Sequence, residues 1–74
     1  MKADLSLRKL GDTIRKHRAN LGISQEAFAD QIGMHRTYYS AVERGERNMT
    51  LKTLLRIAQG LKVRLEDLMA DANM

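Results

Sequence analysis

The spacing of glycine, in a chain that contains no proline, most constrains what this sequence can fold into. The five glycines lie at positions 11, 22, 33, 45 and 60, which are 11, 11, 12 and 15 residues apart. The last four come where a helical pattern of apolar residues stops, so they predict left-handed C-terminal caps. No window shows sustained period-two alternation of β-branched residues, and aromatic residues make up only 4 % of the chain. The sequence therefore predicts an all-α fold built from short helices.

Length and charge limit the classes of function open to the chain. Its 74 residues allow one small domain with a thin core. They contain no signal-peptide pattern and no apolar run of membrane length, so we expect a cytoplasmic location. The absence of cysteine excludes disulfides and thiolate metal sites. A net charge of +4 favours a polyanionic partner, although charge alone supports only non-specific attraction.

The first helix is predicted over about residues 7–20, because apolar residues recur there at helical spacing along one face. Gly11 lies inside this helix and is expected to let another helix approach closely. Arg18 falls on the same apolar face, where a charged side chain needs a partner. The face consists of Leu7, Leu10, Ile14 and Leu21.

Two short helices separated by three residues are the most informative feature of the sequence. Ser24 has the chemistry of an N-cap for a helix over residues 25–32, which ends after two turns. A third helix is expected to begin at Arg36, with His35 as a poor N-cap. Because a two-turn helix is not stable alone, it is useful where it holds the next helix at a fixed angle. The sequence therefore predicts a helix-turn-helix over about residues 24–44.

The third helix presents an outer face of small or hydrogen-bonding side chains with an arginine at each end. A solvent-exposed helix face more often carries Glu, Lys and Gln. Arg36 can donate two hydrogen bonds to guanine O6 and N7, Thr37 can bond a base edge, and Ala41 leaves room for close approach. This composition suits insertion into the major groove of DNA. The outer face consists of Arg36, Thr37, Ser40, Ala41 and Arg44.

Two further helices are predicted in the C-terminal part, over about residues 50–70. The first begins after Thr50 and stops at Gly60, and the second covers residues 65–70. We expect residues 71–74 to fray. The apolar face of the longer helix is predicted to consist of Leu51, Leu54, Leu55 and Ala58.

An apolar patch on the last helix predicts how the chain associates. Leu65, Leu68 and Met69 lie on an element too short to bury all of them, and we interpret them as a dimer interface. The alternative interpretation is that they close the core of the monomer. One copy of the third helix offers too few base contacts for useful specificity. This favours a homodimer that places two such helices in successive major grooves.

Two stretches of sequence resemble the lambda-repressor/Cro-like (XRE) family of DNA-binding proteins. Residues 25–34, QEAFADQIGM, followed by residues 43–45, ERG, are similar to its helix-turn-helix, and the resemblance covers about residues 7–70. More narrowly, residues 35–40, HRTYYS, with residues 42–48, VERGERN, are similar to the controller proteins of restriction–modification systems. The resemblance implies a compact five-helix domain and a sequence-specific transcription regulator of bacterial or phage origin. The homodimer expected above would bind an operator with two-fold symmetry.

The resemblance implies roles for single residues as well. Gln25 would bond a phosphate and brace Arg36. Arg18 and Glu43 match a buried ion pair of the family, in which Glu43 holds the third helix to the first. The residues that match base-contacting or neighbouring phosphate-contacting positions are Arg36, Thr37, Tyr38 and Ser40, and those that would grip the DNA backbone beyond are Arg44, Arg47 and Asn48.

The sequence departs from the family pattern at three positions. Phe28 stands where Leu is usual, and Tyr39 stands where a branched aliphatic residue is usual. Both changes bear on the volume of the core and on the tilt of the third helix. Arg64 stands where a Ser-like cap often opens the fifth helix, which bears on the start of that helix.

We therefore expect a homodimeric controller protein that binds double-stranded DNA and either blocks or recruits RNA polymerase. An antitoxin or phage-type repressor with the same module is the nearest alternative. A helical adaptor that binds protein is an alternative of another class, which the polar face of the third helix disfavours. RNA binding is a further alternative, but the chain lacks the stacking aromatic residues that are typical of it. No enzymatic activity, cofactor, small-molecule ligand or metal site is expected, since His17 and His35 have no Cys or carboxylate at ligand spacing.

Overall fold

The protein forms five α-helices and no strand over residues 2–73, the part of the chain that the computed structural model describes. The all-α prediction with five helices is therefore confirmed, while residues 1 and 74 lie outside the described residues. None of the described helices is both long and apolar enough to span a membrane. The helices are α1 (Lys2–Asn20), α2 (Gln25–Gln31), α3 (Arg36–Glu43), α4 (Leu51–Leu61) and α5 (Leu65–Asp71).

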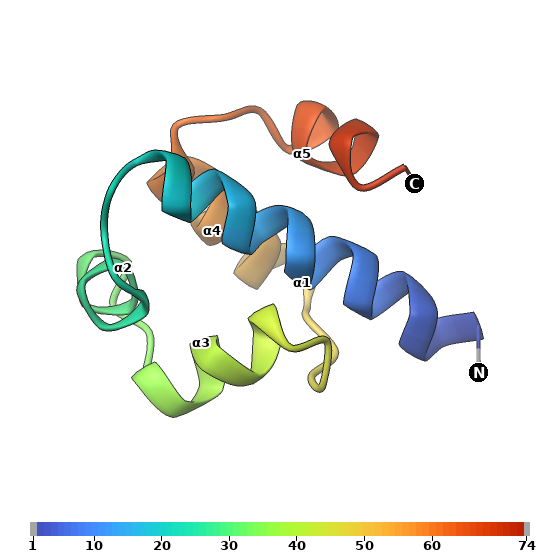
Figure 1. Ribbon diagram of the computed structural model, residues 1–74, viewed down its shortest axis with the longest axis horizontal. Helices are drawn as coiled ribbons and strands as arrows, with labels where there is room; N and C mark the ends of the chain where they lie inside the picture. The colour runs from blue at the N-terminus through green and yellow to red at the C-terminus, as the bar shows by residue number, and fades with distance from the viewer. Residues whose placement is uncertain (1, 74) are drawn as a thin grey trace.

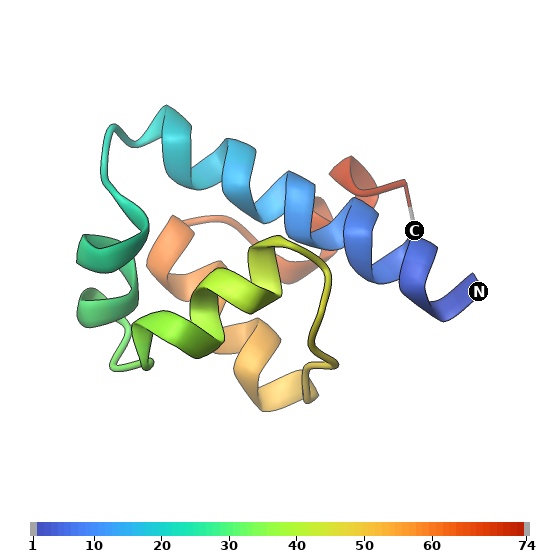
Figure 2. The same ribbon diagram turned by 60° about the horizontal axis from the view of Figure 1, so that its bottom comes forward.

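The longest helix, α1, runs through the middle of the arrangement (Figure 1). It packs against α3, α4 and α5, and α2 packs against α3. Turning the molecule shows α2 and α3 following one another along one side, with the loop to α4 leaving the far end of α3 (Figure 2). Side chains from all five helices meet in one core, whose largest members are Leu10, Ile14, Phe28, Tyr39, Val42, Ile57, Leu61 and Leu68.

The limits of α1 differ from the predicted ones. The helix begins at Lys2 rather than near residue 7, because apolar spacing marks only the buried turns and Leu5 is 58 % exposed. Leu21 follows the helix and is exposed, so it does not belong to the apolar face. A Cβ atom at Gly11 would lie 2.5 Å from the carbonyl oxygen of Val42 in α3. The predicted close approach of another helix at Gly11 is thus confirmed.

One of the four glycines predicted to end a helix lies inside it instead. The other three have positive φ, whereas Gly60 belongs to α4, and Lys62 is the left-handed residue that ends this helix. A Cβ atom at Gly60 would clash with the side chain of Ile32 and would lie 3.0 Å from the ring of Phe28. Close packing of α4 against the end of α2 therefore explains this glycine, rather than backbone conformation.

The face that α4 turns to the core also differs from the predicted one. Leu51 and Leu55 are 64 % and 43 % exposed, whereas Ile57 and Leu61 are buried. The helix carries two apolar stripes of the same spacing, one that starts at Leu51 and one that starts at Leu54. Both are compatible with an amphipathic helix. Packing against the other helices selects the second stripe and leaves two leucines at the surface.

Burial in α5 corrects the predicted dimer interface. Leu68 is fully buried, so it closes the core of the monomer, as in the alternative interpretation, and does not belong to a surface patch. Leu65 and Met69 are partly buried and pack against the core. The expected fraying is wrong for the described part of the tail, because α5 continues through Asp71 and Ala72 is 3 % exposed.

Candidate nucleic-acid interface

Side-chain caps start both helices of the helix-turn-helix. Ser24 Oγ accepts a hydrogen bond from a backbone N–H of α2 at 3.1 Å. His35 Nδ1 accepts one from the backbone N–H of Thr37 at 3.2 Å, so this residue caps α3 although it is a poor choice for the position. The two helices and their turn lie within the predicted range of residues 24–44.

An aromatic pair holds α2 against α3. The rings of Phe28 in α2 and Tyr39 in α3 have centroids 5.2 Å apart and are tilted by 54°. Both side chains are fully buried, and tilted rings at this distance attract each other beyond the area they bury. These are two of the positions at which the sequence departs from the family pattern. Because the two larger side chains are neighbours, their contact sets the separation of the two helices.

Arg18 of α1 and Glu43 of α3 form an ion pair at the edge of the core. Arg18 Nε lies 2.7 Å from Glu43 Oε2, and Nη2 lies 3.2 Å from Oε1. Arg18 Nη1 also donates to the carbonyl oxygen of Ile23 at 2.7 Å. Glu43 is only 6 % exposed, so the pair is largely removed from water. It joins α1 to α3 and to the segment that leads into α2.

Glu43 has two further donors. Gln25 Nε2 donates to Glu43 Oε1 at 2.7 Å, and Tyr39 Oη donates to Glu43 Oε2. Burial by itself would raise the pKa of Glu43, but the hydrogen bonds from Arg18, Gln25 and Tyr39 outweigh burial and lower this pKa. Burial first, and then the hydrogen bond to Glu43, raises the pKa of Tyr39. Glu43 is thus a carboxylate at neutral pH that connects three helices.

The exposed face of α3 and the start of α2 form an open depression. Ser40 Oγ donates to Gln25 Oε1 at 3.3 Å and accepts a hydrogen bond from Arg44 Nη1 at 2.8 Å. Arg44 also forms an ion pair with Glu46 at 3.1 Å. The structure therefore brings together five of the residues predicted to contact DNA. They are Gln25, Arg36, Thr37, Ser40 and Arg44.

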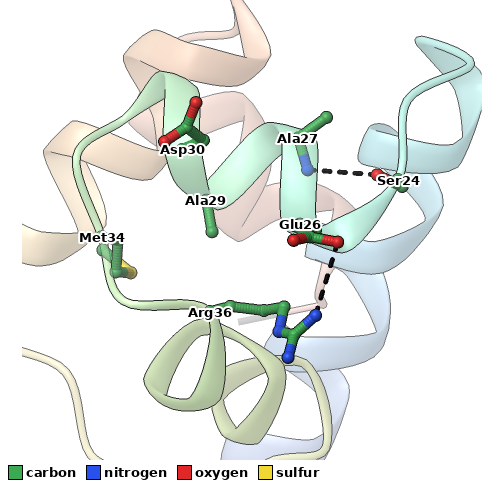
Figure 3. Close-up of a pocket in the computed structure, with 7 residues that line it drawn as sticks. All are labelled: Ser24, Glu26, Ala27, Ala29, Asp30, Met34 and Arg36. Atoms are coloured by element: carbon green, nitrogen blue, oxygen red, sulfur yellow. Dashed lines mark hydrogen bonds and ion pairs between the residues drawn. The ribbon is translucent and has the colours of Figure 1, made fainter.

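A second depression lies between α2 and the first turn of α3, and Figure 3 labels the residues that line it. Glu26 of α2 reaches across it, with Oε1 3.4 Å from Nη1 of Arg36 (Figure 3). Both side chains are mostly exposed, so the pair contributes little to stability. Glu26 is therefore an intramolecular partner for the guanidinium group of Arg36, which the sequence pattern did not reveal.

The loop after α3 is attached to that helix through Tyr38. The guanidinium carbon of Arg47 lies 5.7 Å from the centroid of the Tyr38 ring, a cation–π arrangement. Tyr38 Oη donates to the backbone carbonyl oxygen of Asn48 at 3.3 Å. Tyr38, in the first turn of α3, therefore contacts both Arg47 and Asn48 of the loop that follows the helix.

Two expected contacts are corrected. Ala41 is only 7 % exposed, so its side chain does not lie on the outer face of α3. Helical spacing placed it there, but spacing does not report how deeply a short side chain lies. Gln25 was expected to brace Arg36, yet its amide is hydrogen-bonded to Glu43 and Ser40. The amide thus links the buried carboxylate to the middle of the exposed face.

The fold and this face together define a helix-turn-helix DNA-binding regulator. The two short helices are joined at a fixed angle, and the second exposes arginines and hydroxyl groups rather than an apolar surface. The described residues show no group of three or more metal-ligating side chains.

Comparison with known proteins identifies the family. The Helix-turn-helix family matches residues 14–68, and the chain belongs to it. Control protein C.MunI of a Mycoplasma species is 47 % identical over 58 residues, which cover 78 % of this chain and 76 % of that protein. The restriction–modification controller protein C.AhdI of Aeromonas hydrophila superposes with a TM-score of 0.81 at 39 % identity, covering 84 % of this chain and 94 % of that one.

A second similar structure contains DNA. It is the tetramer of the controller protein C.Esp1396I in complex with its natural 35 base-pair operator, with a TM-score of 0.79 and 36 % identity. The match covers 93 % of this chain and 96 % of that one. The resemblance to controller proteins that the sequence indicated is therefore confirmed, both at the level of sequence and at the level of fold.

Proposed function

We propose that this chain controls transcription of a restriction–modification system by binding an operator as a homodimer through α3. The observation that carries the proposal is the exposed face of α3. It presents hydrogen-bonding side chains between two arginines, and the buried cluster around Glu43 holds its orientation. Similarity to controller proteins supports the choice of this function among those that the family serves.

In the proposed complex, α3 lies in the major groove. Arg36 donates to guanine, while Thr37 and Ser40 contact neighbouring base edges. Contacts to phosphates set the position of the helix and carry no sequence information. They are proposed for Gln25, Tyr38, Arg44, Arg47 and Asn48.

A homodimer would place two α3 helices about 34 Å apart, one turn of B-DNA, so that they read an inverted repeat. We place its interface at Leu65 and Met69 of α5, with the exposed Leu55 of α4 as further apolar surface. Met69→Lys should shift the sedimentation coefficient from dimer to monomer while circular dichroism still shows folded helices. Leu5→Lys, which changes an exposed leucine on α1, should leave the dimer intact.

Regulation would follow from the position of the operator. A dimer bound next to a promoter blocks RNA polymerase or recruits it, and two adjacent operators would let one protein do both. The tetramer of C.Esp1396I on its operator supports this arrangement as a hypothesis for the present chain.

Selection of bound sequences from random DNA tests the proposal. We expect enrichment of an inverted repeat whose half-site centres lie about 10 base pairs apart. Affinity for the selected sequence should fall steeply as the salt concentration rises, because phosphate contacts release counterions. A protein that enriches no sequence, or whose binding is insensitive to salt, would not be a DNA-binding regulator of this kind.

A further inference from the structure

Gln25 links a buried carboxylate to the DNA-binding face. Its Nε2 donates to Glu43 Oε1 at 2.7 Å, and its Oε1 accepts from Ser40 Oγ at 3.3 Å. Ser40 Oγ in turn accepts from Arg44 Nη1 at 2.8 Å. Four polar groups thus form one chain of hydrogen bonds, which begins inside the protein and ends on the exposed face of α3.

The direction of this chain is determined by Glu43. An ionised carboxylate only accepts hydrogen bonds, so the amide of Gln25 must turn its NH2 group toward it. The opposite orientation would place the Gln25 carbonyl oxygen against a carboxylate oxygen that already accepts from Arg18. Because the amide cannot turn over without losing this bond, its carbonyl oxygen faces Ser40.

The carbonyl oxygen of Gln25 then decides what Ser40 can offer to DNA. A serine hydroxyl has one hydrogen to donate and two lone pairs that accept. The hydrogen is directed to Gln25, and Arg44 occupies one lone pair. Toward a base, Ser40 is therefore a hydrogen-bond acceptor, whether or not Arg44 stays in place.

We propose that Gln25 is a positioning residue that makes Ser40 an acceptor, so that Ser40 selects a base with an exocyclic amino group in the major groove. This inference rests on the proposed DNA-binding function. Adenine N6 and cytosine N4 are the donors that the major groove presents, whereas guanine O6 and N7 and thymine O4 are acceptors. Without the amide of Gln25, the hydroxyl of Ser40 could rotate. It could then either donate to or accept from a base, and it would not discriminate among the four bases.

The test compares base preferences of the full chain by selection from random DNA. Ser40→Ala identifies the base pair that Ser40 reads. At this pair, replacing adenine by purine, or cytosine by 2-pyrimidinone, removes the exocyclic amino group, and we expect this change to weaken binding of the wild-type chain about three- to tenfold, the range of one net hydrogen bond. Gln25→Ala should abolish the preference at this pair and leave the preference read by Arg36 unchanged. Combined with Ser40→Ala, it should cause no further loss of preference at this pair, because both changes remove the same base contact, although the phosphate contact proposed for Gln25 lowers the affinity for all sequences alike. Gln31→Ala, which alters an exposed glutamine of the same helix, should change neither preference.

Several outcomes would overturn the inference while leaving DNA binding intact. They are an unchanged wild-type affinity when the exocyclic amino group is removed from the base at the pair that Ser40 reads, no change of base preference in Ser40→Ala, or additive losses of preference in the double variant. Ser40→Ala changes a side chain at the surface of α3, so its result stands even if Gln25→Ala unfolds. Failure of the wild-type chain to enrich any sequence would instead contradict the proposed function itself.

Discussion

Arg18 and Glu43 are 25 residues apart in the sequence, yet Arg18 Nε donates to Glu43 Oε2 at 2.7 Å and joins α1 to α3. The helix α3 has only eight residues, so its orientation depends on contacts with the rest of the fold. Three side chains donate to the one carboxylate of Glu43. Stability of the fold and orientation of the DNA-binding face therefore depend on the same group.

Replacing Glu43 by Ala should destabilise the protein strongly. The change leaves the guanidinium of Arg18 without its buried partner, which costs about 3–5 kcal/mol. Urea unfolding followed by circular dichroism measures the difference. Glu66→Ala breaks an exposed pair with Arg64 and should cost about 0–1 kcal/mol, so equal losses in the two variants would contradict burial of the Arg18–Glu43 pair.

Stability should fall in acid because of Glu43. Its pKa is lower in the folded state than the ordinary value of 4.5, so the unfolded chain takes up the proton first as the pH falls. The contribution of Glu43 is complete above pH 4.5 and is lost as the pH falls through the lowered value. Between about pH 3 and 6, the free energy of unfolding should rise less steeply with pH in Glu43→Gln than in the wild-type chain. Parallel curves would show that other carboxylates dominate.

Tyr39→Phe should separate the packing role of this ring from its hydrogen bond. The ring contact with Phe28 is retained, while a hydrogen bond to a buried carboxylate is removed, at a cost of about 1.5–3 kcal/mol. Tyr38→Phe is the matched control, since its hydroxyl bonds a loop carbonyl oxygen near the surface and its loss should cost about 0.5–1 kcal/mol. Thermal unfolding of both variants measures the two losses of stability, and we expect the larger loss in Tyr39→Phe. A smaller loss for position 39 than for position 38 would be the contrary result.

Arg36→Ala should weaken operator binding and relax the base preference at one position of each half-site. We expect a loss of about 1–3 kcal/mol and a relaxed preference at one base pair per half-site, because Arg36 is proposed to bond a guanine. Competition binding with single-base operator variants measures this. Glu26→Gln, which removes the partner carboxylate but keeps Arg36, should retain the preference and bind slightly more tightly. An unchanged preference in Arg36→Ala would exclude base reading by this residue.

Arg47→Ala should weaken binding to every sequence alike. Its proposed contact is to a phosphate, so base preference should not change. The slope of log affinity against log salt concentration should become shallower by about one per contact. Titrations at several salt concentrations on operator and random DNA measure both quantities. Selective loss at one base pair would assign Arg47 to base reading instead.

The order of the helices and the face of α3 could be predicted because they depend on local patterns. Ser24 caps the helix that follows it directly, and Arg36, Thr37 and Ser40 share a face through helical periodicity alone. Tyr39 lies four residues before Glu43 on one helix, a spacing that places the two side chains side by side. This signal was present in the sequence, although the pattern of apolar residues assigned Tyr39 only to the core.

Depth in the fold could not be predicted in the same way. Leu51 and Leu54 begin equally regular stripes on α4, and only packing against other helices leaves the first of them exposed. Leu68 and Ala41 likewise lie deeper than their helical positions indicate, because neighbouring elements cover them. Burial is a property of several helices together, and no single segment contains it.

By itself, the sequence determined the five helices in their order, the helix-turn-helix and the side chains that α3 presents, because caps, glycines and apolar spacing act over a few residues. Only the tertiary structure decided which leucines reach the surface and that Gln25 donates to Glu43. It also decided that Gln25 faces Ser40 rather than Arg36. These two contacts of Gln25 join residues 15 and 18 positions apart, and their distances depend on how α2 and α3 pack.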